Sequence, residues 1–105
     1  MQKDVYKKTQ GLAKLLFMAQ TESEMVGLLH DIFTQAELSK AHERVKIFAC
    51  LQDGLSQRET QKKSSAAIAT VTHGAQFLRD SALVIRNIIT QAQEESWWNK
   101  LFWRA

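Results

Sequence analysis

The stretch LSQRETQKKSSAAIATVTHG, residues 55–74, decides how this chain is interpreted. It contains two short helix-forming runs separated by the pair Ser64-Ser65. The second run consists almost entirely of small or β-branched residues, which bring little intrinsic helix preference. Two short helices joined by a tight turn, in a basic chain, predict a helix-turn-helix at about residues 56–76. In that motif the second helix enters the DNA major groove while the first crosses the backbone.

The composition of the second run fits a helix that lies close to base edges. Threonine can hydrogen-bond to either base type, and Ala, Ile or a threonine methyl can touch the thymine methyl group. We expect Val71, three residues after Ile68, to hold this helix to the core. Side chains of the phosphate-binding type surround the run: Ser56, Gln57, Arg58, Lys62, Lys63 and Arg79. An alternative is that the basic side chains of the first helix form only a solvated face.

The rest of the chain also has helical patterns, and helix starts are marked by capping boxes. Three Ser/Thr-x-x-Glu pairs occur: Thr21 with Glu24, Thr34 with Glu37, and Ser56 with Glu59. With no proline and four glycines, helices can run long. The predicted helices span about 3–19, 22–33, 35–53, 57–63, 66–76 and 81–102. The fold class is therefore predicted to be all-α.

Length and composition restrict the class of protein. A chain of 105 residues with 45% hydrophobic residues is expected to form one domain, residues 1–105. Small domains bury a smaller share of their surface, so a second copy could supply missing core. The net charge of +3 is compatible with a polyanionic partner. The single cysteine, Cys50, excludes an internal disulfide and is expected to be a buried small residue in a reducing cytoplasm. The longest early apolar run, residues 15–19, is too short for a membrane span, so an intracellular location without a membrane partner is expected.

Two blocks of the sequence resemble the bacterial tryptophan operon repressors. The first is Ser56-Gln57-Arg58-Glu59, followed by Ile68-Ala69-Thr70-Val71-Thr72, Gly74 and Arg79. The second is Phe33-Thr34 with Glu37, followed by Arg44-Val45-Lys46-Ile47. The resemblance covers about residues 28–80. It implies a six-helix subunit in an intertwined homodimer, binding of double-stranded palindromic operator DNA, transcriptional repression, and L-tryptophan as a small-molecule corepressor.

The resemblance also implies roles for individual residues. The implied DNA contacts are Gln57, Arg58, Ile68, Ala69, Thr70, Thr72 and Arg79. For the ligand, Arg44 would lie against one indole face, the carbonyls of Asp31 and Phe33 would take the amino group, and Thr34 would bind the carboxylate. Gly74 would leave room for the ligand. Gln61 stands where the family often has a basic residue, which puts one phosphate contact in doubt.

The most important departure from the family pattern is His73, which replaces an arginine that covers the other indole face and pairs with the carboxylate. A histidine offers one donor and no permanent charge, whereas arginine offers a charged fork of donors. We therefore expect weak or pH-dependent tryptophan binding, or a different ligand. Two further departures, Thr60 and Ser64, replace core-facing apolar residues, and Ser65 replaces the glycine of the left-handed turn.

Two other functions stay open: a helix-turn-helix DNA binder with a lost or altered ligand response, and a helical dimerisation or adaptor module that does not bind DNA. The pairs His30-Asp31 and His42-Glu43 are not expected to form catalytic or metal sites, because adjacent helical residues point in different directions. No enzyme and no metal are expected. The aromatic residues of 97–103 are expected to pack on a partner subunit rather than enter a membrane interface.

Overall fold

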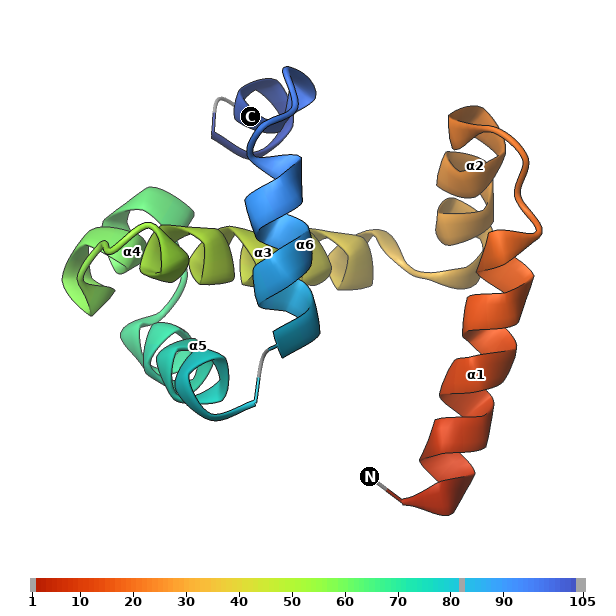
Figure 1. Ribbon diagram of the computed structural model, residues 1–105, viewed down its shortest axis with the longest axis horizontal. Helices are drawn as coiled ribbons and strands as arrows, with labels where there is room; N and C mark the ends of the chain where they lie inside the picture. Colours follow the sequence, from red (N-terminus) through yellow and green to blue (C-terminus); the bar gives the residue numbers. More distant parts are fainter. Residues whose placement is uncertain (1, 82, 104–105) are drawn as a thin grey trace. The chain divides into compact units, whose positions relative to one another are not determined.

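The computed structural model describes residues 2–81 and 83–103, and every regular element within those ranges is helical (Figure 1). The elements are α1 (Lys3–Phe17), α2 (Glu22–Ile32), α3 (Gln35–Gln52), α4 (Gln57–Ser64), α5 (Ile68–Asp80), α6 (Leu83–Ala92) and a π-helical turn, η1 (Asn99–Trp103). The predicted all-α class is confirmed. The bounds of the first four helices agree with the sequence pattern to within two residues at each end.

The prediction of one long helix over residues 81–102 is wrong. α6 ends at Ala92, and residues 93–96 form a turn closed by the Glu94 and Glu95 N–H groups, which donate to the Gln91 and Ala92 carbonyls at 3.2 and 3.0 Å. The reversal allows Trp98 to bury its ring, which is 3% exposed. Burial of a large aromatic side chain therefore outweighs continuation of the helical pattern.

The chain divides into two compact units, Met1–Leu38 and Ser39–Ala105. In the first unit, neither α1 nor α2 contains a buried residue. Its exposed large apolar side chains are Val5, Tyr6, Leu12, Leu15, Phe17, Met18, Val26 and Ile32. The described residues of the first unit, 2–38, thus contain no buried core of their own. The single domain over 1–105 remains a prediction, because this division describes packing within the chain.

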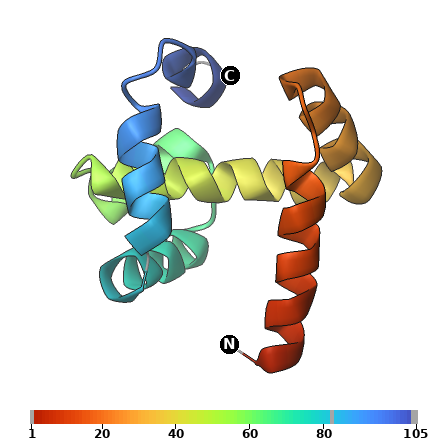
Figure 2. The same cartoon turned by 45° about the vertical axis from the view of Figure 1, so that its right-hand side comes forward.

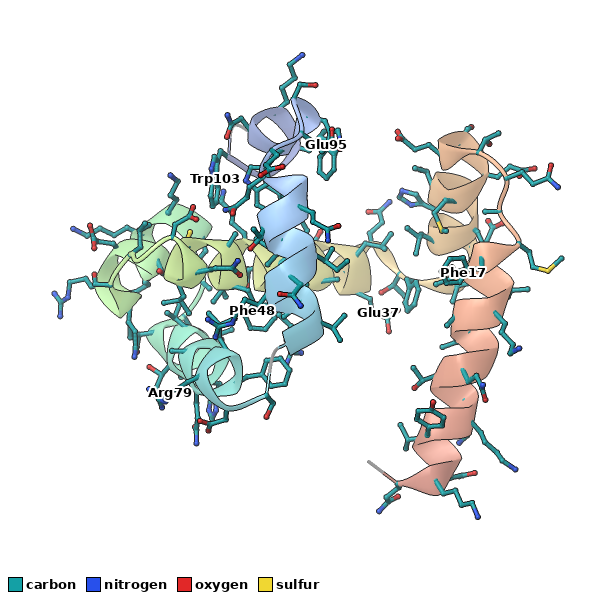
Figure 3. The ribbon with its side chains drawn as sticks, viewed as in Figure 1. Phe17, Glu37, Phe48, Arg79, Glu95 and Trp103 are labelled. Carbon is teal, nitrogen blue, oxygen red and sulfur yellow. The ribbon has the colours of Figure 1, made fainter. Side chains whose placement is uncertain are left out.

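The core of the second unit surrounds α3. Four consecutive residues, Ile47 to Cys50, are all buried, so this part of α3 is covered on every side. One cluster joins Phe48 and Ala49 to Leu78, Ile89 and Trp98, and a second joins Ile47 to Ala66 and Val71. Figure 3 shows Phe48 where α6 crosses α3.

Polar contacts fix the crossing of α6 over α3, which Figures 1 and 2 show from two sides. The side-chain amide of Gln52 donates to the Arg86 carbonyl at 2.9 Å and to Thr90 Oγ1 at 2.6 Å. The guanidinium of Arg86 in turn donates to the Leu78 carbonyl near the end of α5. These bonds lock α3, α5 and α6 together around the first core cluster.

Cys50 is free and buried, as expected from the sequence. Burial raises the pKa of its thiol, which disfavours the reactive thiolate at neutral pH. Its role in the fold is that of a small apolar side chain.

The three predicted helix starts are confirmed. The Thr21, Thr34 and Ser56 hydroxyls each accept from the N–H of the glutamate three residues later, at 3.1 Å. The Glu37 and Glu59 carboxylates accept in return from the N–H groups of Thr34 and Ser56. The Glu24 carboxylate accepts instead from the Gln20 N–H, one residue earlier.

The charge of one capping glutamate should make stability depend on pH. The Ser56 backbone N–H, which donates to Glu59, holds the pKa of that carboxyl below its ordinary value of 4.5. This stabilisation is complete above pH 4.5 and is lost as pH falls through the lowered folded-state pKa. We expect Glu59→Gln to flatten the loss of stability below pH 4.5, measured by urea unfolding across pH. Glu95→Gln, an exposed glutamate outside a capping box, should leave the profile unchanged; equal profiles for both variants would contradict the assignment.

Candidate DNA-reading head and ligand cavity

The turn between α4 and α5 is built by the serine pair. Ser65 ends α4 in the left-handed conformation, with φ 63° and ψ 16°, and its N–H donates to the Gln61 carbonyl at 2.9 Å. The Ser64 hydroxyl accepts from the Ala66 N–H at 3.2 Å, so the hydroxyl at this position closes the turn. The predicted turn at Ser64-Ser65 is therefore confirmed, together with its non-glycine left-handed residue.

Ser65→Gly should stabilise the protein. A non-glycine residue in the left-handed region costs on the order of 1 kcal/mol, which glycine removes, although the more flexible unfolded chain offsets part of the gain. We expect the free energy of unfolding to rise by about 0.5–1 kcal/mol in urea titrations. The control is Ser96→Gly, a turn serine whose φ is not positive. A loss of stability in Ser65→Gly would argue against backbone strain at this turn.

The second helix begins later and runs further than predicted. α5 spans Ile68–Asp80, and Ala67 precedes it in an extended conformation with ψ 147°. Val71 is fully buried, as expected of the residue that holds the helix to the core. The predicted reading residues Ile68, Ala69, Thr70 and Thr72 are exposed. The first turn and a half of α5 thus presents small side chains outward from a helix anchored on its inner face.

Two of the residues predicted to contact DNA, Gln57 and Thr72, are hydrogen-bonded to each other. The Thr72 hydroxyl donates to Gln57 Oε1 at 2.8 Å and also lies 3.0 Å from the Ile68 carbonyl. The bond links the first turn of α4 to α5 and fixes the relative orientation of the two helices. It leaves the amide nitrogen of Gln57 as the group available for a phosphate oxygen.

We call the pair of helices α4 and α5 the reading head. The basic residues predicted to contact DNA lie at its two ends. Arg58 is exposed in the first turn of α4. Arg79, in the last turn of α5, extends from the helix in Figure 3 and has a 71% exposed side chain. Its Nε lies 3.9 Å from the Asp80 carboxylate, an exposed pair that contributes little energy. Both guanidinium groups are therefore accessible to a polyanion.

A cavity of about 270 Å³ lies between α3 and α5. Its lining residues are Lys40, Glu43, Arg44, Ile47, Phe48, Thr70, His73 and Gly74. The structure thus brings together three of the predicted ligand residues, Arg44, His73 and Gly74. Thr70, for which the resemblance implies a DNA contact, also lines the cavity. Its side chain therefore borders both the predicted DNA-binding surface and the ligand cavity.

Two cavity residues, Lys40 and Glu43, were missed by sequence reasoning. The signal was available: Lys40, Glu43, Arg44 and Ile47 follow the spacing i, i+3, i+4 and i+7, which places them on one face of a helix. Glu43 makes no ion pair within 4.0 Å among residues 2–81 and 83–103. The cavity therefore contains the carboxylate of Glu43 beside the basic side chains of Lys40 and Arg44.

At Gly74, α5 lies close against the side chains of α3. A Cβ atom at this position would lie 3.0 Å from Ile47 Cγ2 and 3.6 Å from Phe48 Cε1. Alanine here would require the Ile47 side chain to move by a few tenths of an ångström. The helix packing alone accounts for glycine, and its proposed ligand role stays a prediction.

The remaining predicted ligand residues, Asp31, Phe33 and Thr34, belong to the first unit. Thr34 caps α3, where its Oγ1 accepts from the Glu37 N–H at 3.1 Å. The hydroxyl proton of Thr34 remains able to donate to a carboxylate. Phe33 ends α2 in an extended conformation, with its N–H donating to the Leu29 carbonyl at 2.9 Å.

Metal ligation and membrane insertion are two further functions that side chains or helices could support. The described part of the chain contains no group of three or more His, Cys, Asp or Glu side chains that could hold a metal ion. Within the same residues, no helix combines the length and the apolar character needed to cross a membrane.

Comparison with known proteins gives one match. The model of the family described as "Trp repressor protein" matches residues 7–93, which includes the whole of α2 to α6 and all the predicted site residues. No curated protein and no solved structure matches the chain.

Proposed function

The chain belongs to the Trp repressor family, and from this membership we propose that it is a transcriptional repressor whose α4 and α5 read operator DNA. The observation that carries the proposal is the exposed start of α5 beside the capped first turn of α4. Val71 holds α5 from within, while Ile68, Ala69 and Thr72 face outward. This is the arrangement that a major-groove reading helix requires.

The proposed active form is a homodimer. The first unit leaves the apolar side chains of α1 exposed. In the second unit, an apolar groove is lined by Phe48, Phe77, Ser81, Val84, Ile85 and Ile88, of which Val84 is 78% exposed. Apolar surface of this extent is usually covered by a partner. A two-fold dimer would also place two reading heads against a palindromic site.

The proposed effector is L-tryptophan or a related flat aromatic amino acid. Ile47 and Phe48 supply an apolar wall to the cavity, Lys40 and Arg44 supply cations, and Glu43 supplies an anion. A ligand with an apolar ring, a carboxylate and an ammonium group would match all three. The family resemblance alone supports a role for Asp31, Phe33 and Thr34 in binding this ligand.

Selection from a random duplex library tests the proposal, with and without tryptophan and at several salt concentrations. We expect enrichment of a palindrome, affinity that falls with salt, and tighter binding with tryptophan. Arg58→Ala should weaken binding to all sequences and reduce the salt slope by about 1, whereas Ile68→Ala should relax the sequence preference. Absence of any enrichment at low salt would overturn DNA reading and favour a dimerisation or adaptor module.

A second candidate function is favoured by His73. A head that reads DNA without responding to tryptophan would keep the exposed face of α5 but lose the charged partner for the ligand carboxylate. In the same selection, identical enrichment with and without tryptophan would support this candidate.

A further inference from the structure

All three tryptophans of the chain lie in the aromatic tail, residues 97–103, outside the residues matched by the family. After the turn at 93–96 the tail packs against its own chain. Trp98 is 3% exposed and belongs to the core cluster with Phe48, Ala49, Leu78 and Ile89. The tail is therefore integral to the fold of the second unit.

A stack of three rings connects the tail to α3. The Trp98 and Phe102 rings lie 4.4 Å apart at 19°, and the Phe102 and His42 rings lie 4.4 Å apart at 3°. His42 Nε2 also lies 2.7 Å from the Leu101 carbonyl oxygen. Stacked aromatic pairs of this kind stabilise a structure beyond the burial of their surface, so the tail is attached to α3 by specific contacts.

The far end of the tail contacts the reading head. Trp103 packs edge-on against Trp98, with centroids 5.9 Å apart at 82°. The ammonium of Lys63, in the last turn of α4, lies 4.5 Å from the centre of the Trp103 ring, a cation–π contact. Figure 3 shows Trp103 in the tail, on the side toward α4. A path of direct contacts thus runs from α3 through the tail to α4.

Within the head, α5 is held by Leu78 in the core cluster with Phe48, whereas α4 carries no large apolar side chain. α4 itself buries Thr60, and the nearby cluster joins Ile47 and the partly buried Leu51 of α3 to Ala66 in the turn and Val71 in α5. We therefore expect α4 to be the less firmly packed helix of the head. The contact of Lys63 with Trp103 adds an attachment at the C-terminal end of α4.

We propose that the aromatic tail is a brace that positions α4, and with it the reading head, through the contact between Lys63 and Trp103. Lys63 and Trp103 act as positioning residues, since neither needs to touch DNA. The consequence for DNA affinity rests on the proposed function, whereas the mechanical role of the tail does not.

The mechanical role is tested without DNA, in the full-length chain. Lys63→Met keeps an apolar stem and removes the charge over Trp103. Lys62→Met is the matched control, since Lys62 is also exposed on α4 and makes no ring contact. We expect faster amide exchange of α4 in Lys63→Met by about two- to fivefold, the factor that a cation–π contact of 0.5–1 kcal/mol supplies. Tryptophan emission, which arises entirely from the tail, should shift in the same variant. Equal exchange and emission in the two variants would overturn the proposal.

The effect on reading is tested with Trp103→Leu on the duplex that the library selects. We expect an affinity lower by about two- to fivefold with an unchanged salt slope, because a neutral residue contributes no phosphate contact. Retained helical circular dichroism shows that the variant is folded. Equal or tighter binding would overturn the positioning role. If the native chain selects no duplex, the exchange experiment still decides whether the brace exists.

Discussion

His73→Arg is expected to raise the affinity for L-tryptophan by about ten- to a hundredfold. His73 lines the cavity with Arg44 and Gly74, and the resemblance to the family implies an arginine at this position. A charged hydrogen bond contributes about 1.5–3 kcal/mol, which corresponds to this range of affinity. The guanidinium also supplies a flat charged surface for an indole ring. Isothermal titration calorimetry at neutral pH measures the change directly.

Gln76→Arg is the matched control for this experiment. Gln76 is exposed on the same helix and does not line the cavity. It adds the same charge without a contact to the ligand. A similar gain in both variants would indicate a general effect of net charge, and no gain in His73→Arg would place the ligand elsewhere.

Thr60→Val is expected to stabilise the protein by about 1–3 kcal/mol. Thr60 is fully buried in α4, and its hydroxyl has no hydrogen-bond partner among the described residues. Valine has nearly the same shape and removes a polar group that burial leaves unsatisfied. The free energy of unfolding in urea gives the result.

Thr90→Val is the control, because the Thr90 hydroxyl is hydrogen-bonded and its removal should have the opposite effect on stability. The Thr90 hydroxyl donates to the Arg86 carbonyl at 3.0 Å and accepts from Gln52 at 2.6 Å. Removing it should lower stability by about 0.5–1.5 kcal/mol. A loss of stability in Thr60→Val would mean that the Thr60 hydroxyl is satisfied by solvent in the folded protein.

Local chemistry made much of the fold predictable. Capping pairs such as Ser56 with Glu59 satisfy their own backbone groups, so they mark helix starts without reference to the rest of the chain. The left-handed conformation of Ser65 could also be predicted from the sequence, because the motif requires such a residue between its two helices. The start of α5 was placed two residues early, since alanine at 66 and 67 is compatible with both helix and extended backbone.

Features that depend on distant contacts could not be read in the same way. The complete burial of α3 from Ile47 to Cys50 results from elements packed on all of its sides, which a single apolar stripe does not reveal. The end of α6 at Ala92 is set by the place that Trp98 occupies in the core. In the cavity, His73 and Arg44 followed from the family resemblance, and the helical spacing from Arg44 could also have indicated Lys40 and Glu43, whereas the pairing of this face with α5 depends on the three-dimensional fold.

The absence of any buried residue in α1 and α2 has a consequence for gene dosage. If a second copy covers these helices, as we propose, their stability rises with protein concentration by mass action. The amount of assembled regulator would then grow with the square of subunit concentration at low abundance. Twofold changes in expression would accordingly alter occupancy of a target site more than twofold, giving the cell a threshold rather than a proportional response.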